Sequence, residues 1–424
     1  MNILEINTAE NKGGAAKIAY FLKSDLKLQG HNTSMFVKIK YSKDSDVFVI
    51  KNKNIISCII KKITGKSIDN YVSTKFHRII ASDIDFFASD NILKTREFKE
   101  AEVIHCHNLH GNYFKLDTLH KMSLDKPVVW TFHDMWPITP HCAHAYECPV
   151  QDGFFSCKSK DDYQGLLWHN EKYLRNKKRN IYDKTNFTIV VPSLWLKDKI
   201  AQTSLKNKSI TLIYNGIDES KFKKYDKQSA REELGLPIDK KILLFISIGK
   251  NTMVKGWEFM QKAVSFYKND PDILFVCIGS KKFEEYENNN IIKYVNYIND
   301  ETTMAKYYSA ADIFLFPSLA ENFPLTVLEA MSCGLPVVSF DVGGTKEALI
   351  HKKNGYIAKY LDGDDLINGV EYILNLSSDR LEDMSKGSIE RVKNNFTKNL
   401  MIKKYKELFE IKIKEYKKYD KTHL

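Results

Sequence analysis

The segment that constrains the fold most runs from residue 310 to residue 349, where short apolar runs alternate with turn-forming residues. Its pattern predicts a buried strand at 313–316, a helix, a second buried strand at 336–340 and a turn at Gly343-Gly344. Two parallel strands joined by a helix have their following loops at the same edge of a sheet, and open α/β sheets bind ligands there. We therefore predict a parallel α/β sheet whose carboxyl edge carries the chemistry.

Two glutamates lie within this segment. Glu321 precedes the predicted helix, and Glu329 follows eight residues later inside the apolar run 327–331. A carboxylate among apolar neighbours needs a partner, because leaving it unpaired costs on the order of several kcal/mol. A pair of ligand hydroxyl groups would supply that partner. The alternative is that both residues are charges that flank a helix and contact no ligand.

The order of residues around this pair resembles a known family. The pattern Glu321-x7-Glu329, followed by Cys333-Gly334-Leu335-Pro336 and by Gly343-Gly344-x-x-Glu347, is similar to the donor-binding block of family 4 retaining glycosyltransferases with the GT-B architecture. The resemblance is strong over residues 241–357 and thinner over residues 1–200. It implies an α/β protein with two Rossmann-like domains whose parallel sheets face a central cleft, and a nucleotide-diphosphate sugar as the donor substrate.

In that family the first glutamate lies beside the donor sugar, and the second holds the ribose hydroxyls of the nucleotide. The resemblance therefore implies a catalytic role for Glu321 and a donor-binding role for Glu329. The backbone of the turn between them is expected to contact the sugar and the diphosphate. That turn consists of Asn322, Phe323, Pro324 and Leu325. Many members have glycine where this chain has Pro324, and proline offers no N–H group to a phosphate.

Two lysines follow the continuous apolar run that begins at residue 241, which predicts a buried parallel strand. In the family an arginine follows the strand glycine and a lysine precedes the next glycine, and both cations bind the donor diphosphate. Lys250 and Lys255 take these places here, and Lys255 is also assigned to catalysis. Lysine keeps the charge at position 250 but lacks the bidentate guanidinium, so we expect Lys255 to do more of the stabilising. Without a ligand, two such lysines would simply be solvated.

Three more residues are assigned to the donor. Gly13 and Gly14 lie between a predicted strand at 1–7 and a helix, where glycines let the backbone approach a ligand and the helix start offers N–H groups to an anion. Such turns also serve only to reverse the chain, but the resemblance implies that this loop lies near the donor phosphate and the acceptor. The segment 295–298, which ends at Ile298, resembles the stretch whose backbone holds the nucleotide base.

Histidines stand at the ends of two predicted strands in the first half of the chain. His133 follows the buried strand 127–132, and its surroundings resemble the family motif in which a histidine contacts the donor sugar. We expect His133 to hydrogen-bond a sugar hydroxyl, with Asp134 fixing its tautomer. His107 and His110 are weaker candidates for lining the acceptor side. A single histidine at a strand end is otherwise usually a structural residue.

A loop after His133 contains three cysteines: Cys142, Cys148 and Cys157. Three states remain open for them, namely unliganded thiols, a structural metal site or a disulfide. A subset of the family has four cysteines in this loop, and Lys160 occupies the place of the fourth here. A complete four-cysteine site is thus excluded, although His141 or His144 could replace the missing ligand. None of these states places the loop in the chemical step.

At 424 residues the chain is too long for a single core, so we expect two domains. We place an acceptor-side Rossmann-like domain at 1–205, a donor-binding Rossmann-like domain at 206–390, and a C-terminal helix at 391–424. In GT-B enzymes the last helix packs back on the first domain. The apolar stripe expected on this helix consists of Leu400, Tyr405, Leu408, Phe409, Ile411 and Tyr416.

The net charge of +11 falls mainly on residues 1–200 and 386–424. A basic face can attract anionic lipid or a phosphorylated lipid substrate, and the lysine-flanked apolar segment 55–63 has the pattern of a helix in a membrane interface. A lysine-rich surface without a partner and a buried helix are the alternatives. Nucleic acid is a poor candidate partner because no recognised nucleic-acid-binding module appears. The sequence contains neither a run of about 20 apolar residues nor a signal peptide, so we expect a cytoplasmic protein that at most touches the inner face of the membrane.

These features predict an enzyme that moves a sugar from a nucleotide-diphosphate donor to a glycan or lipid-linked glycan acceptor, as in bacterial polysaccharide synthesis. We expect no cofactor. We also expect metal-independent activity, because the Asp-x-Asp sequence at 83–85 falls in an irregular segment rather than in a fitting loop. Two other functions stay open: a GT-B-like nucleotide-sugar epimerase, which would convert the donor without an acceptor, and a non-catalytic partner subunit, which would bind the donor without forming product.

Overall fold

The structure is a computed structural model that describes residues 1–50, 77–85, 88–157, 166–247, 254–279 and 291–422. The chain forms two compact units, residues 1–213 with 402–424 and residues 214–401. The apolar segment 55–63 lies outside the described residues. Among the helices that are described, none is long and apolar enough to cross a membrane.

Within its described residues, the first unit contains a sheet of seven parallel strands. In spatial order they are β3 (Val47–Val49), β2 (Asn32–Ile39), β1 (Asn2–Ala9), β4 (Val103–Cys106), β5 (Val128–Thr131), β8 (Thr188–Val191) and β9 (Ile210–Leu212). The chain order reverses between β1 and β4, where Glu5 lies opposite His105. Because all strands run the same way, the loops after β1, β4 and β5 lie at one edge of the sheet.

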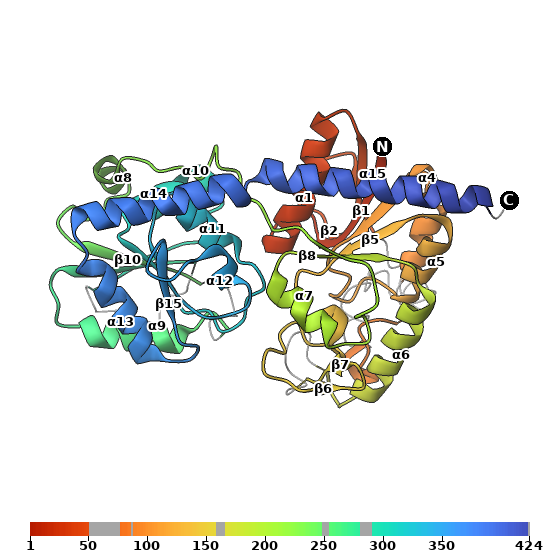
Figure 1. The fold of residues 1–424 in the computed structure, drawn as a ribbon, viewed down its shortest axis with the longest axis horizontal. Helices are drawn as coiled ribbons and strands as arrows, with labels where there is room; N and C mark the ends of the chain where they lie inside the picture. The colour runs from red at the N-terminus through yellow and green to blue at the C-terminus, as the bar shows by residue number, and fades with distance from the viewer. Residues whose placement is uncertain (51–76, 86–87, 158–165, 248–253, 280–290, 423–424) are drawn as a thin grey trace, which may run out of the picture. The chain divides into compact units, whose positions relative to one another are not determined.

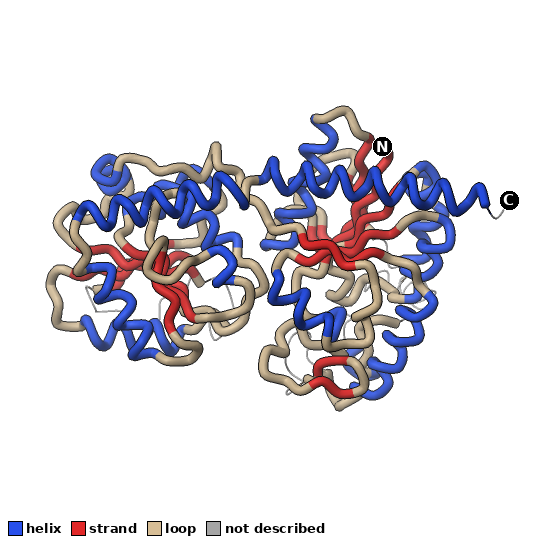
Figure 2. Tube along the Cα trace, viewed as in Figure 1, coloured by secondary structure: helices blue, strands red, loops and turns tan. Residues whose placement is uncertain are grey.

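Helices flank this sheet (Figure 2). They are α1 (Gly14–Leu28), α4 (Arg96–Glu100), α5 (Asp117–Asp125), α6 (Glu171–Lys184) and α7 (Leu194–Ala201), with 3-10 turns η1 (Ser89–Lys94) and η2 (Trp136–Ile138) and a hairpin of β6 (Val150–Gln151) and β7 (Phe154–Phe155). α1 buries Ile18, Leu22 and Leu26, which share one helical face. The indole of Trp130 on β5 is fully buried among aromatic rings, which makes it a centre of the core.

The C-terminal helix α15 (Lys398–Thr422) packs on the first unit, as predicted; it is the blue helix that ends at the C-terminus in Figure 1. Tyr405 and Phe409 are buried against the ring of His105, each at a centroid distance of 5.1 Å. The predicted apolar stripe is wrong at Ile411, which is half exposed, whereas Ile413 is buried. A repeat of 3.6 residues per turn places residue 413 on the face of residues 405 and 409 and turns residue 411 away.

The second unit has the same kind of parallel sheet, with six strands among the residues that the structure describes. Their spatial order is β12 (Ile292–Val295), β11 (Ile273–Ile278), β10 (Lys241–Ile246), β13 (Ile313–Phe316), β14 (Val337–Phe340) and β15 (Gly355–Ala358). The flanking helices are α8 (Lys227–Glu233), α9 (Trp257–Tyr267), α10 (Glu301–Ala310), α11 (Leu325–Ser332), α12 (Thr345–Ala348), α13 (Gly363–Leu374) and α14 (Ser378–Asn395). The chain order reverses between β10 and β13, so ligands are expected in the loops that follow these two strands. The strand, helix and strand predicted around Glu329 are confirmed as β13, α11 and β14.

Candidate functional site

The loops that follow β10 and β13 bring a lysine and a glutamate together. Lys255 Nζ lies 2.5 Å from Glu321 Oε1, and the hydroxyl of Ser318 donates a hydrogen bond of 2.7 Å to the same oxygen. The Glu321 side chain is largely buried, while about a third of the Lys255 side chain is exposed. The structure therefore joins two of the predicted site residues at the carboxyl edge of the second sheet.

Glycines make this arrangement possible because the backbones of three loops touch. Gly256 has φ +74°, and a Cβ at this position would lie 1.8 Å from the carbonyl oxygen of Pro317. Gly343 has φ +55°, and its Cβ would lie 1.8 Å from the carbonyl oxygen of Glu321. Only glycine fits at either position. The loop that carries Glu321 is thus held between the loop after β10 and the loop after β14.

The turn from Asn322 to Leu325 leads into α11. Gly344 N donates a hydrogen bond of 2.7 Å to Asn322 O, and Asn215 Nδ2 donates one of 3.1 Å to Phe323 O. The side chain of Phe323 is buried against the rings of Tyr214 and Phe396. This packing anchors the turn to the core of the second unit. Pro324 is the N-cap of α11 and provides no side-chain cap, which leaves the first N–H groups of this helix to other acceptors.

Glu329 lies inside α11, where its side chain is buried. Tyr308 on α10 donates a hydrogen bond of 3.2 Å to Glu329 Oε2. Burial and the nearby Glu329 carboxylate raise the pKa of Tyr308 well above its usual value, so the hydroxyl keeps its proton. The partner that sequence reasoning required for this carboxylate is therefore at least in part a tyrosine of the protein.

The other predicted donor residues occupy loop positions. Ile298 is half-buried in the segment between β12 and α10. Gly13 is the N-cap of α1 with φ +100° and Gly14 is its first residue; both are exposed, in the loop after β1 of the first unit. Lys250 lies outside the described residues.

Two histidines at the carboxyl edge of the first sheet share a hydrogen bond. His107, after β4, and His133, after β5, lie with His107 Nδ1 2.8 Å from His133 Nε2. Burial and the neighbouring His107 lower the pKa of His133 well below its usual value, so His133 is neutral at neutral pH. His133 was predicted from the sequence, but its partnership with His107 was not.

Asp134 was expected to orient His133, but its carboxylate is hydrogen-bonded to His110 and to the backbone of Trp136. His110 Nε2 lies 2.7 Å from Asp134 Oδ2, and Trp136 N donates to Asp134 Oδ1 at 2.9 Å. Burial alone would raise the pKa of Asp134, but the pairing with His110 holds it below its usual value. Asp134 and His110 thus form a second polar pair beside His133.

Sequence reasoning missed Glu5, which is fully buried in β1 with Oε2 2.8 Å from His107 Nε2. The signal was present, since Glu5 interrupts the apolar run Ile3-Leu4-Glu5-Ile6 just as Glu329 interrupts its own. The rule that a carboxylate among apolar neighbours needs a partner would have identified Glu5 as a candidate for a buried polar contact.

In the cysteine loop, the structure pairs Cys142 with Cys157 as a disulfide. Cys148 is a buried free thiol outside this pair. The ligand atoms of His141, Cys142 and Cys157 lie within 4.8 Å of one another, so reduction of the disulfide would leave three potential metal ligands together. The three-cysteine metal site considered from the sequence is therefore not the arrangement found here.

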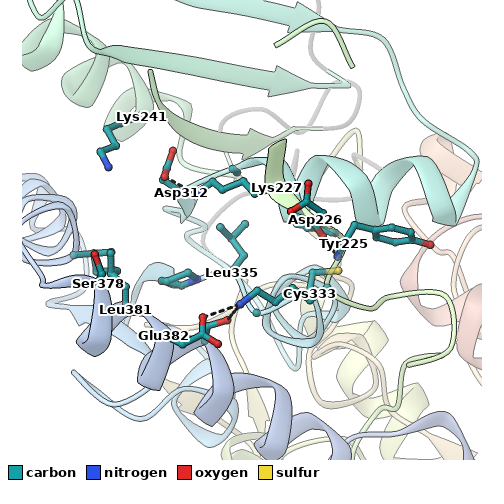
Figure 3. A pocket seen from close by; sticks show the side chains of 18 of the residues that line it. Tyr225, Asp226, Lys227, Lys241, Asp312, Cys333, Leu335, Ser378, Leu381 and Glu382 are labelled. Carbon is teal, nitrogen blue, oxygen red and sulfur yellow. Dashed lines mark hydrogen bonds and ion pairs between the residues drawn. The ribbon is translucent and has the colours of Figure 1, made fainter. Parts of the chain in front are cut away.

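A cavity of about 420 Å³ lies at the opposite, amino edge of the second sheet (Figure 3). Lys241 at the start of β10, Asp312 before β13 and Pro336 before β14 line it, together with Glu382 of α14. Neither Lys255 nor Glu321 does. The cavity is thus separate from the loops that carry the candidate site, although Tyr308, the partner of Glu329, also borders it.

Two Rossmann-like units with polar side chains at the carboxyl edges of parallel sheets define an α/β protein of the GT-B class. A sequence model described as "Glycosyl transferases group 1" matches residues 226–391, and one described as "Glycosyltransferase Family 4" matches residues 12–221. Together they match most of the chain. The chain belongs to the family 4 glycosyltransferases.

Individual relatives are distant. The chain is 26% identical over 286 residues to an uncharacterized glycosyltransferase of Methanocaldococcus jannaschii, covering 64% of this chain and 66% of the relative. It is 25% identical over 210 residues to the UDP-Gal:alpha-D-GlcNAc-diphosphoundecaprenol alpha-1,3-galactosyltransferase of Escherichia coli, covering 47% of this chain and 54% of the relative. The matched segment spans 39% of the length of an uncharacterized glycosyltransferase of Haemophilus influenzae and 68% of the length of spore coat protein SA of Bacillus subtilis, so it covers only part of these relatives.

Solved structures share the fold over nearly the whole chain. Sucrose-phosphate synthase from Thermosynechococcus elongatus superposes with a TM-score of 0.69 at 19% identity, covering 96% of this chain and 98% of that one. HepE of Anabaena, solved in complex with UDP-glucose, superposes with a TM-score of 0.65 at 15% identity, covering 96% and 99%. At these identities the likeness establishes the fold alone.

Proposed function

We propose that this protein is a retaining glycosyltransferase that moves a sugar from a nucleotide-diphosphate donor to a glycan or lipid-linked glycan, in the synthesis of a bacterial polysaccharide or glycolipid. The observation that carries the proposal is the Lys255–Glu321 pair, held by glycine contacts where the chain order of the second sheet reverses. Family membership supports the reaction class, and the Escherichia coli relative supports the class of acceptor.

The reaction needs charge stabilisation above all. As the bond between the anomeric carbon and the phosphate breaks, negative charge grows on the departing diphosphate. The ammonium of Lys255 and the N–H groups at the start of α11 are suited to stabilise that charge, because both are in place before it develops. Such preorganised electrostatic stabilisation is usually the largest single contribution to catalysis. Glu321, which pairs with Lys255, orients that ammonium and is proposed to contact the donor sugar.

Glu329 is proposed to bind the ribose of the nucleotide. Its carboxylate is buried and Tyr308 already holds Oε2, so the orientation of the group is set before a ligand arrives. A pre-oriented carboxylate loses little conformational entropy when it accepts two ribose hydroxyls. His133 is proposed to hydrogen-bond a hydroxyl of the donor sugar, while Gly13, Gly14, Ile298 and the turn 322–325 are proposed to contact the donor through their backbones.

We propose that the anomeric configuration is retained, and family membership supports this. Retention requires attack on the same face as the departing phosphate, which takes the proton of the acceptor hydroxyl. We propose that no metal takes part, because Lys255 supplies positive charge and the Asp-x-Asp residues are otherwise engaged. Asp83 Oδ2 accepts a hydrogen bond of 2.6 Å from Trp136 Nε1, and Asp85 Oδ2 accepts one of 2.7 Å from Tyr173.

The proposed acceptor suggests where in the cell the protein acts. We propose a cytoplasmic protein that contacts the inner, anionic face of the membrane, where a lipid-linked acceptor would be presented. The surplus of lysine and arginine in residues 1–200 and 386–424 supports this, since a basic surface is attracted to anionic lipid.

The proposal is tested by screening nucleotide sugars for thermal stabilisation of the protein, and then by assaying transfer from the best donor to lipid-linked acceptors. We expect saturable stabilisation by one nucleotide-diphosphate sugar and an acceptor-dependent product with the donor's anomeric configuration. Incubation with the donor alone separates the alternatives, because an epimerase would convert it without an acceptor. Stabilisation by donor without product from any acceptor would favour the non-catalytic subunit.

A further inference from the structure

The cavity at the amino edge of the second sheet has the size of a ligand site rather than of a packing defect. Protein cores are packed as densely as organic crystals and contain few voids larger than a water molecule. This cavity measures about 420 Å³, within the range of roughly 300–1,000 Å³ that small-molecule pockets occupy. Its lining residues all belong to the second unit. The fold does not explain it, because open α/β sheets bind their ligands at the carboxyl edge.

The inner wall of the cavity is apolar. Leu335, Ile373 and Tyr308 line it, and all three are buried. Leu335 lies between α11 and β14, and Leu381 of α14 adds apolar surface from a second element (Figure 3). Burial of apolar surface is favourable by about 25 cal/mol per Å². The cavity therefore favours a ligand with an apolar body.

The rim of the cavity is charged, and its carboxylates are already engaged. Asp312 accepts hydrogen bonds from Lys227 Nζ at 2.6 Å and Arg231 Nη2 at 2.8 Å, and from a backbone N–H group of β10 at 2.6 Å. Glu382 Oε2 lies 3.0 Å from Lys224 Nζ. The remaining carboxylate of the lining is the N-cap of α8 and accepts hydrogen bonds in the first turn of that helix. The rim therefore offers little to a cation.

Lys241 supplies a positive charge that is not balanced in the same way. It is the first residue of β10, it is exposed, and it lines the cavity (Figure 3). Lys224 and Lys227 each contact a carboxylate, whereas within the described part of the chain Lys241 Nζ forms neither an ion pair nor a hydrogen bond. An ammonium beside an apolar wall attracts an anion more strongly than one in bulk water, because the lower dielectric constant weakens the field less. The opening therefore favours a negatively charged group.

One helix and one tyrosine connect the cavity to the candidate donor site. α11 carries Glu329, and residues 333–335, just beyond its end, line the cavity. Tyr308 also lines it and donates the hydrogen bond of 3.2 Å to Glu329 Oε2. A Cβ at Gly334 would lie 2.4 Å from Ser385 Oγ of α14, so the end of α11 is tightly packed. A molecule in the cavity would therefore contact the residues that position Glu329.

We propose that this cavity is an effector site for a small anion with an apolar body, such as an aryl or alkyl phosphate, and that its occupancy is coupled to donor binding through Tyr308. The apolar body packs against Leu335 and Tyr308, and the anionic group pairs with Lys241. Contact with Tyr308 restrains the hydroxyl that orients Glu329, so a bound anion increases the affinity for the donor nucleotide. The coupling rests on the proposed ribose-binding role of Glu329, whereas binding of the anion does not.

Binding is tested with 1-naphthyl phosphate, which joins an aromatic body to a phosphate group. Isothermal titration calorimetry of the full chain without nucleotide measures its affinity, and 1-naphthol serves as the uncharged comparison. We expect one molecule of 1-naphthyl phosphate per chain and much weaker binding of 1-naphthol. Absence of 1-naphthyl phosphate binding, or equal affinity for the two compounds, would overturn the proposal.

Variants locate the bound molecule. Lys241→Ala should weaken the binding of 1-naphthyl phosphate about fivefold, because it removes a charged partner of the phosphate. The matched control is Lys268→Ala, which removes another exposed lysine of the second unit, at the end of α9 and outside the cavity lining. Leu381→Trp fills the cavity and should abolish binding. Unchanged affinity in both Lys241→Ala and Leu381→Trp would place the molecule elsewhere and overturn the proposal; if Leu381→Trp does not fold, Lys241→Ala decides.

The coupling is measured with the tightest-binding nucleoside diphosphate among UDP, GDP, ADP, CDP and dTDP. Saturation with 1-naphthyl phosphate should increase its affinity about fivefold, and the nucleotide should increase the affinity for 1-naphthyl phosphate by the same factor. In Tyr308→Phe the two should bind independently. Nucleotide affinity that does not change when the cavity is filled would overturn the effector role. If no nucleoside diphosphate binds, the proposed function fails and the effector role fails with it, while the titrations without nucleotide still decide whether the cavity binds an anion.

Discussion

Lys255 Nζ and Glu321 Oε1 lie 2.5 Å apart, on two loops whose backbones are in contact through Gly256. The positive charge of Lys255 is partly balanced by the carboxylate of Glu321. An arriving diphosphate must compete for that ammonium or share it. The close backbone contacts at Gly256 and Gly343 fix the loops that carry the two side chains.

Lys255→Ala should reduce kcat by about 10²- to 10³-fold, because it removes a preorganised charge aimed at the departing diphosphate. Thermal stability should change little, since the lysine is partly exposed and surface ion pairs contribute at most about 1 kcal/mol. The matched control is Lys262→Ala on α9, which removes an exposed ion pair with Asp364 in the same unit. Equal losses of activity in the two variants would argue against a specific role for Lys255.

Gly256→Ala and Gly343→Ala should each destabilise the second unit by about 2–4 kcal/mol. In both cases the new methyl group would lie 1.8 Å from a carbonyl oxygen, and the backbone has positive φ. Gly235→Ala is the control, because it has φ +59° but its Cβ would meet only a lysine side chain at 4.0 Å. It should cost about 1 kcal/mol from backbone strain alone. Chemical unfolding followed by circular dichroism compares the three, and similar values for all would mean that the loop contacts do not matter.

Tyr308→Phe should weaken donor binding several-fold while the protein stays folded. The substitution removes the hydroxyl that orients Glu329 Oε2 and leaves the buried ring in place, at a cost of about 1 kcal/mol. Isothermal titration with the nucleoside diphosphate gives the affinity. Tyr307→Phe, one residue earlier on the same helix, should bind like the unmodified protein. Unchanged affinity in Tyr308→Phe would remove the basis for assigning Glu329 to a pre-oriented ribose site.

The first unit should lose stability as the pH falls from about 6.5 to about 4. Burial lowers the pKa of His107 from 6.5 to about 4, so over this range the unfolded chain binds a proton that the folded one does not. Stability must then decrease with falling pH, by at most about 3 kcal/mol from this residue. Unfolding followed by tryptophan fluorescence at several pH values measures it. His107→Asn should flatten the slope, and an identical slope would show that His107 is not the group responsible.

Peptide mapping without reductant should recover Cys142 linked to Cys157, with Cys148 modified as a free thiol. After reduction, the proximity of His141 predicts that the loop takes up one Zn²⁺ per chain, detectable by a chromogenic chelator. A freshly isolated protein that already holds one zinc and lacks the linked peptide would contradict the disulfide. Neither state should alter the kcat of transfer, since the loop is placed outside the chemical step.

Much of this arrangement could be predicted because it follows local patterns. The order of strand, helix and strand around Glu329 follows from apolar periodicity, and the place of Glu321 and Lys255 at one sheet edge follows from parallel topology. The contacts that sequence reasoning missed join residues on neighbouring strands of the sheet. His107 was only a weak candidate and Glu5 was not considered, because their contact depends on the lateral pairing of β1 with β4, two strands about 100 residues apart.

Other differences have a similar origin. The partner of Glu329 is a tyrosine from the preceding helix, and helix packing is not visible in a one-dimensional pattern. The error at Ile411 is different, because the helical repeat alone favours Ile413 beside Tyr405 and Phe409. The part of the diphosphate site at Lys250 lies outside the described residues and stays a prediction.

The most direct test of the central claim is transfer of labelled sugar from a nucleotide-diphosphate donor to a lipid-linked acceptor, compared among the unmodified protein, Lys255→Ala and Glu321→Gln. We predict acceptor-dependent product with the unmodified protein and a loss of at least a hundredfold in both variants, with the Lys262→Ala control fully active. Product formed at the normal rate by Lys255→Ala and Glu321→Gln would contradict the account.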